Sequence, residues 1–172
     1  MTEQAVKTYT DFVLPSSVVT KVDVSHLVSE VERIDDALTA AAVRAGVGAT
    51  QDVAPVLSQQ LTDFLAQNTL SLLVAKERTE LIKQLRLLKE KVPVIHMTFA
   101  VTADPESLQE IAAWVRTEVS SQAVIAVGLQ PSLVAGVYLR TPNHVQDLSL
   151  RGRLAEQRDV LAKELGALRG NR

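Results

Sequence analysis

Apolar positions in the first half of the chain recur every three or four residues, the spacing of one helix face. Three such stripes predict helices at about residues 25–46, 52–66 and 69–91. Short connections between them favour an antiparallel bundle. Residues 1–22 show no clear period and fit a short helix, an extended arm or two strand fragments. The stripe of the first helix, which we expect to be core, consists of Leu27, Val31, Ile34 and Leu38.

Charged residues lie opposite these stripes. The third predicted helix mixes lysine, arginine and glutamate on its outer side, a pattern typical of a solvated face. The first helix carries an acidic run that helical spacing spreads over exposed positions. The basic residues of the third helix are Lys76, Arg78, Lys83, Arg86 and Lys89, and the acidic run is Glu30, Glu32, Asp35 and Asp36.

The period changes from helical to alternating after Pro93. Residues 94–101 alternate and predict a strand. Asp104 and Pro105 are a favoured start for a helix that ends near Ser120. In that helix Trp114 lies off the apolar stripe, and both an interface and a core position stay open.

Two apolar runs and a terminal helix complete the second half. Residues 123–129 are apolar on both faces, which predicts a central strand. Residues 134–140 predict another strand, and residues 149–168 a final helix, with a short extra strand at Val145-Gln146 as an option. The fold class is therefore α+β: a helical N-terminal domain at 1–92, then a β-α-β-β-α domain at 93–172.

The composition is that of an ordinary folded protein, with 47% hydrophobic residues, 22% charged residues and a formal net charge of −2. That charge gives no reason to expect nucleic-acid binding. The absence of cysteine excludes disulfides and thiolate chemistry. No apolar run reaches the roughly 20 residues of a membrane span, so we expect no direct membrane insertion. The N-terminus shows no signal or transit peptide.

Catalytic chemistry finds little support in the residues. The histidines at 26, 96 and 144 do not share metal-ligand spacing with one another. The paired serines lack the glycine elbow of a nucleophile. We therefore expect no catalytic, metal-binding or cofactor-binding residues.

Residues 130–154 combine a turn, an apolar strand, a loop and the start of a basic helix. Ser149 is a favoured cap for that helix. Arg151 and Arg153 lie in its first turn, where a cation opposes the helix dipole at a cost of about 0.3–1 kcal/mol. Two interpretations are equally good: the arginines have specific carboxylate or carbonyl partners, or they point into water. The leucine stripe of the helix, which fits either its own sheet or a partner helix, is Leu150, Leu154, Leu161, Leu165 and Leu168.

The two segments Pro131–Val137 and Asp147–Leu154 resemble the C-terminal signature of the delta subunit of F-type ATP synthase, the family of the oligomycin-sensitivity-conferring protein. The family pattern is an aliphatic-small-Gly strand start followed by Asp-x-Ser-x-Arg-Gly-x-Leu. The order of predicted elements extends the resemblance to roughly residues 93–168. The motif and interface positions that it implies are Gly136, Asp147, Ser149, Arg151, Gly152, Arg153, Leu154, Leu161, Leu165 and Leu168.

The sequence departs from the family pattern in two regions. Gln130 stands where Asp is frequent, Leu148 where Gly is common, and Thr141–His144 replaces a Gly-Asp turn. The family's N-terminal domain has six helices, whereas about three are evident here, so this domain is shortened or divergent.

The resemblance implies a non-catalytic subunit of the peripheral stalk, or stator, of a proton-translocating ATP synthase. In the family, the N-terminal bundle grips the alpha subunits of the catalytic head, and the C-terminal part joins the b subunits. The protein would then be a peripheral component on the cytoplasmic face of a bacterial cell membrane. The alternative is a free-standing adaptor that binds another helical partner.

Overall fold

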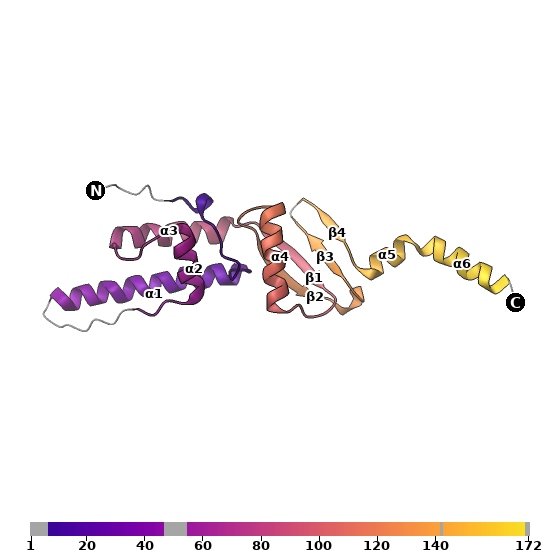
Figure 1. Ribbon diagram of the computed structural model, residues 1–172, viewed down its shortest axis with the longest axis horizontal. Coiled ribbons are helices and arrows are strands. Elements are labelled where there is room, and N and C mark those ends of the chain that lie inside the picture. Colours follow the sequence, from indigo (N-terminus) through magenta and orange to yellow (C-terminus); the bar gives the residue numbers. More distant parts are fainter. Residues whose placement is uncertain (1–6, 47–54, 142, 171–172) are drawn as a thin grey trace. The chain divides into compact units, whose positions relative to one another are not determined.

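The chain forms two compact units, each described here by itself. The computed structural model describes residues 7–46, 55–141 and 143–170 (Figure 1). The first unit comprises residues 1–93 and 108–124, and the second comprises residues 94–107 and 125–172. Helices and a four-stranded sheet are both present, which confirms the α+β class. The expected domain limits at 92 and 93 remain a prediction.

The first unit is built on three helices: α1 (Lys21–Gly46), α2 (Gln59–Asn68) and α3 (Ala75–Lys91). A capping box opens α1, because the Thr20 hydroxyl accepts from the Asp23 amide and the Asp23 carboxylate accepts from the Thr20 amide. Three residues of the predicted stripe are core as expected, since Leu27, Val31 and Ile34 are at most 1% exposed, whereas Leu38 is only partly buried. Helix α1 ends at Gly46, also as expected.

The predicted starts of the next two helices are wrong. Helix α2 begins at Gln59, and the described residues before it, from Pro55 to Ser58, are not helical. The Ser58 side chain caps α2, and this local signal outweighed the apolar residues upstream. Asn68 is the last residue of α2. Helix α3 starts only at Ala75, because Thr69 takes the left-handed conformation that ends a helix.

The N-terminal strap, Tyr9–Val19, belongs to the core of the first unit. It opens with a short 3-10 turn and continues without regular secondary structure, with a second turn at Ser16 and Ser17. The ring of Phe12 meets that of Phe64 edge to face, with 5.4 Å between centroids. The strap residues Leu14 and Val18 are at most 4% exposed. Of the three options left open by the sequence, the strap is an extended arm, here with two short turns.

Helix α4 (Pro105–Glu118) follows the first strand. The Asp104 carboxylate accepts from the amide and hydroxyl of Ser107, so the predicted cap is confirmed. Ala112 and Val115 are fully buried. Trp114 is 56% exposed, which settles its position on the surface of the chain.

The second unit holds a sheet with strand order β2-β1-β3-β4. Its strands are β1 (Val94–Phe99), β2 (Val124–Leu129), β3 (Val137–Arg140) and β4 (Val145–Asp147). Strands β1 and β3 are antiparallel, as are β3 and β4. The amide of Val124 bonds the Pro93 carbonyl and that of Gln130 bonds the Phe99 carbonyl. Because both partners advance by six residues, β2 runs parallel to β1.

Strand β2 lies at the edge of the sheet, so its predicted central position is wrong. The β1-α4-β2 crossover places β2 on one side of β1, and the β3-β4 hairpin takes the other side. The apolar residues in the second half of β2 are accordingly exposed: Val127 by 45% and Leu129 by 58%. The optional short strand exists, as β4.

The predicted terminal helix is two helices. Helix α5 (Leu150–Glu156) ends at Gln157, and α6 (Arg158–Gly170) follows at once. Among the described residues, no helix combines the length and the apolar character needed to cross a membrane.

Candidate functional site

The residues of the C-terminal signature form a junction between the β3–β4 hairpin and helix α5. The Ser149 hydroxyl accepts a 3.0 Å hydrogen bond from the Gly152 amide, which confirms Ser149 as the cap of α5. The Asp147 carboxylate in turn accepts from the Ser149 amide at 2.9 Å. Ser149 is fully buried. Together, Asp147 and Ser149 satisfy amides of the helix start that have no partner within the helix.

Gly152 is required because Asp147 lies directly against it. A Cβ at position 152 would come within 2.7–2.9 Å of the carboxyl atoms of Asp147. Any side chain there would push the carboxylate from the start of α5. The pairing of Asp147 with Gly152 in the motif is therefore a steric requirement.

Gly136 is required for both conformation and space. Its φ is +89°, a region that side-chain-bearing residues rarely adopt. A Cβ there would overlap the backbone carbonyl oxygen of Leu148 and lie 3.0 Å from the Ser149 Cα. Gly136 thus lets the start of β3 pass against the residues that lead into α5.

Backbone hydrogen bonds fix the same junction. The Leu150 amide bonds the Ala135 carbonyl at 2.9 Å, and the Leu148 amide bonds the Val137 carbonyl at 3.0 Å. Val134 has φ +68° and ψ −53°, and the Ala135 amide bonds the Leu133 carbonyl across it. This is a strained γ-turn, and such a conformation costs about 1–3 kcal/mol at a β-branched residue. The surrounding hydrogen bonds hold that strained turn in place.

The Asp147 carboxyl carries a charge that the junction stabilises. The hydroxyl and then the backbone amide of Ser149 lower the pKa of Asp147 from its ordinary value, and the positive charge of Arg151 adds to the effect. Burial opposes this lowering of the pKa by more than Arg151 adds to it. The contacts of Ser149 are therefore the main reason that the Asp147 carboxyl stays ionised at the junction.

Neither Arg151 nor Arg153 forms an ion pair within the part of the chain that the structure describes, and both are exposed. The leucines of the terminal stripe also lie on the surface: Leu150 is 43%, Leu154 48% and Leu165 63% exposed. The side chains of Leu161 and Leu168 lie outside the described part. The described stripe positions are thus open to solvent in the isolated chain.

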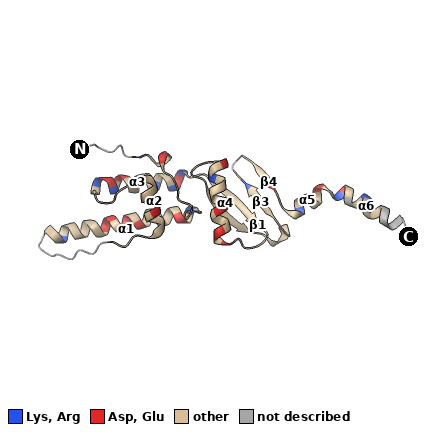
Figure 2. Ribbon diagram, viewed as in Figure 1, with Lys and Arg blue, Asp and Glu red and all other residues tan. Residues whose placement is uncertain are grey.

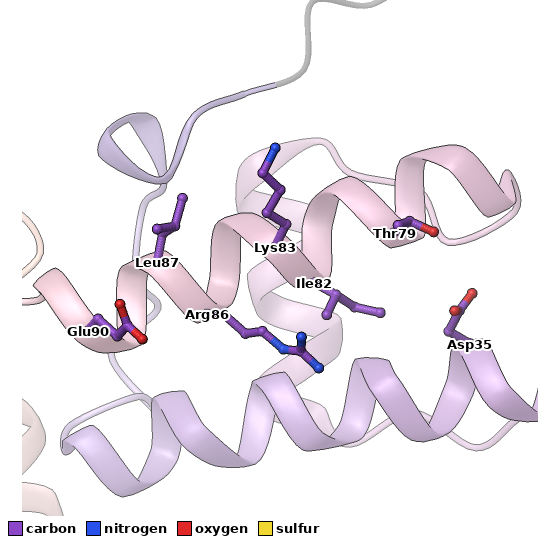
Figure 3. Close-up of a pocket in the computed structure, with 7 residues that line it drawn as sticks. All are labelled: Asp35, Thr79, Ile82, Lys83, Arg86, Leu87 and Glu90. Carbon is purple, nitrogen blue, oxygen red and sulfur yellow. The ribbon is translucent and has the colours of Figure 1, made fainter.

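A second candidate surface is a groove between α1 and α3 in the first unit, with a volume of about 320 Å³ (Figure 3). Its apolar lining residues are Ile82, which points toward α1, and Leu87, which points to the other side of α3 (Figure 3). Its lining residues are Asp35, Thr79, Ile82, Lys83, Arg86, Leu87 and Glu90.

Ion pairs join the two helices at this groove, where residues of both signs occur on α1 and α3 (Figure 2). Arg86 bonds Glu32, and Arg78 bonds Asp35 at 2.6 Å. Arg78 is 5% exposed and also donates to the carbonyls of Leu72 and Leu73. The expectation of a solvated face is therefore wrong for Arg78, and the acidic run of α1 supplies its partner.

The sequence did not predict that three polar residues are buried or partly buried and bond several backbone groups. They are Asn68, Arg78 and Arg116. Asn68 is fully buried and bonds both backbone groups of Val13. Each of the three stands three or four residues from a buried apolar residue of its own helix: Phe64, Leu81 and Ala112 respectively. Because residues at that spacing share a helix face, a polar residue in phase with an apolar stripe was the available signal.

Within the described residues, no cluster of three or more His, Asp or Glu side chains could hold a metal ion. The junction and the groove offer hydrogen bonds, charge and apolar surface. Both features suit contact with another protein chain.

Comparisons with known proteins agree with the signature. ATP synthase subunit delta of Enterobacter sp. (strain 638) is 32% identical over 103 residues, which cover 60% of this chain and 58% of the relative. The same subunit of Pectobacterium atrosepticum is 33% identical over 103 residues, with the same coverage. The match thus spans less than two thirds of these relatives. The model of the ATP synthase delta (OSCP) subunit family matches residues 22–161, and the chain belongs to that family.

Proposed function

We propose that this protein is a non-catalytic peripheral-stalk subunit of a proton-translocating F-type ATP synthase. The observation that carries the proposal is the family match over residues 22–161, which includes both the helical unit and the C-terminal junction. The stalk prevents the catalytic head from turning with the rotor, so its subunits need firm contacts at two ends. The complex would place the protein at the cytoplasmic face of a bacterial cell membrane, as a peripheral component.

The helical unit is the proposed contact for the alpha subunits of the head. The groove between α1 and α3 supports this assignment, because it exposes apolar side chains between charged ones (Figure 3). An amphipathic helix would bury its apolar face on Ile82. Lys83 and Glu90 would remain at the rim, where charges guide the approach of a partner.

The terminal helices are the proposed contact for the b subunits. Leu154 and Leu165 are exposed on successive helices, and the junction fixes the direction in which α5 leaves the hairpin. Apolar residues at helical spacing suit a coiled contact with a long partner helix. Arg151 and Arg153 lie beside this stripe and can meet carboxylates of the partner.

Two variants of the full chain test the two contacts separately. Ile82→Glu places a charge in the groove, and we expect roughly tenfold weaker binding to the purified catalytic head with unchanged binding to the b subunits. Leu154→Asp combined with Leu165→Asp should produce the reverse pattern. Lys76→Glu on α3 and Lys163→Asp on α6 are matched controls, since both residues are exposed.

Circular dichroism must show that each variant keeps the helical content of the unaltered protein. Failure of the unaltered chain to bind either the head or the b subunits would overturn the proposal and favour a free-standing adaptor. If one substitution weakened both contacts, the assignment of a separate partner to each surface would be wrong.

A further inference from the structure

The N-terminal strap lies outside any sheet or α-helix, and side chains of other elements bond several of its backbone groups. Asn68 bonds the amide and carbonyl of Val13, and Gln84 accepts from the Tyr9 amide. Gln60 donates to the Ser17 carbonyl. Buried backbone groups are almost always paired in native proteins, so these side chains are a condition for burying the strap.

Arg116 of helix α4 makes the largest set of these contacts. Its guanidinium donates to the carbonyls of Leu14, Pro15 and Val18 in the strap, the second at 2.9 Å, and to that of Ala123 at 3.1 Å. Four of its hydrogen bonds thus end on backbone carbonyls. A guanidinium has five donors in a fixed planar arrangement, which suits several acceptors at once.

The Asp23 carboxylate partly compensates the charge of Arg116. Burial lowers the pKa of its guanidinium from the usual value, and the Asp23 carboxylate opposes that shift. Asp23 also accepts from the amides of Val19 and Thr20, where the strap turns into α1. The cation therefore bonds strap carbonyls and is stabilised electrostatically by the carboxylate at the start of α1.

Gln122, just beyond α4, extends the same contact along the strap. Its amide donates to the carbonyls of Tyr9 and Phe12, at 2.5 and 3.0 Å. The segment 108–124 belongs to the first unit, although α4 has its first residues in the second. The strap is thus the element of the first unit that Arg116 and Gln122 both bind.

We propose that Arg116 is a positioning residue that clamps the N-terminal strap and, through it, holds α4 in the helical unit. Loss of the guanidinium would remove the side-chain donor of the Leu14 and Val18 carbonyls, whereas the Pro15 carbonyl would keep the Val18 amide. The strap and α4 would then loosen together, while α1 and α3 keep their own contacts. In a stalk subunit this clamp would stiffen a segment that the chain uses to pass between its units; that consequence rests on the proposed function, whereas the clamp itself does not.

Hydrogen exchange followed by mass spectrometry on the isolated full chain tests the clamp. In Arg116→Met we expect roughly tenfold or faster exchange in peptides covering residues 9–20 and 108–124, with α1 and α3 peptides unchanged. Arg116→Lys should be intermediate, because one ammonium group cannot reach all the carbonyls. Arg33→Met, which removes an exposed arginine of α1, is the matched control and should change nothing.

A second readout uses chymotrypsin, for which Phe12 is a protected site at 3% exposure. Faster cleavage at Phe12 in Arg116→Met would support the clamp. Unchanged exchange and cleavage would overturn it, and so would equal loss of protection in every helix, which would mark Arg116 as a general core residue. Should Arg116→Met fail to fold, Gln122→Leu must raise exchange at residues 9–13; its failure to do so would also overturn the clamp.

Discussion

The helical unit and the terminal helices carry the same kind of leucine stripe with opposite outcomes. In α3, Leu85 and Leu88 are fully buried, whereas in α5 and α6 Leu154 and Leu165 are about half exposed or more. Polar residues differ in the same way: Arg78 is buried and paired, while Arg151 and Arg153 are exposed. Helical spacing therefore identifies a helix and its apolar face but does not say what covers that face.

A leucine-to-alanine substitution in each region should give the largest difference in the free energy of unfolding. Leu85→Ala should lower the free energy of unfolding by about 2–5 kcal/mol, because it leaves a cavity in a closed core. Leu165→Ala should change it by no more than about 0.5 kcal/mol, since that side chain already meets solvent. Urea unfolding followed by circular dichroism measures both values. Equal losses would show that the stripe of α6 is covered within the chain.

Two glycines of the second unit extend this comparison, because one is closely packed and the other is open. Gly136→Ala should cost about 2–4 kcal/mol, because the new methyl group meets a positive φ and the backbone of Leu148. At Gly166 in α6 an added Cβ would meet no described atom within 4 Å beyond the adjoining backbone of its own helix, so Gly166→Ala should favour the helix by about 0.5–1 kcal/mol. Thermal unfolding of the two variants compares them directly, and a tolerated alanine at 136 would contradict the described junction.

The smallest expected effect is the pH dependence of the junction. The pKa of Asp147 is lower in the folded chain than its ordinary value of 3.8, so the ionised carboxylate stabilises the junction above that pH. This contribution is lost as the pH falls through the lowered pKa. An NMR titration of the Asp147 carboxyl carbon should therefore give a midpoint below 3.8, and Asp147→Asn should remove the dependence. A midpoint at or above 3.8 would disprove the stabilising contacts.

Local signals in the sequence were sufficient for several elements. The cap at Asp104, the cap at Ser149 and the alternation of β1 were predicted correctly, because each depends on residues close together in the chain. The starts of α2 and α3 were misplaced, since apolar residues before them matched the helical period without forming helix. The edge position of β2 could not be read from its composition, because strand order depends on the crossover connection.

The candidate site also has features that local sequence signals predict and features that depend on distant residues. The motif Asp147-x-Ser149-x-Arg151-Gly152 could be recognised in the sequence, but the steric reason for Gly152 became visible only with Asp147 lying against it. The binding of the strap by Asn68 and Arg116 joins residues 55 to about 100 positions apart, and no local pattern encodes such a pair.

The sequence by itself determined the family, the α+β class and the helical faces, because these depend on short-range periodicity, capping and a compact motif. Tertiary structure decided which faces are buried, which polar residues lie inside and how the strap is held. The physical reason is that burial is a property of neighbours in space: an apolar stripe or an arginine takes its role from the atoms packed against it.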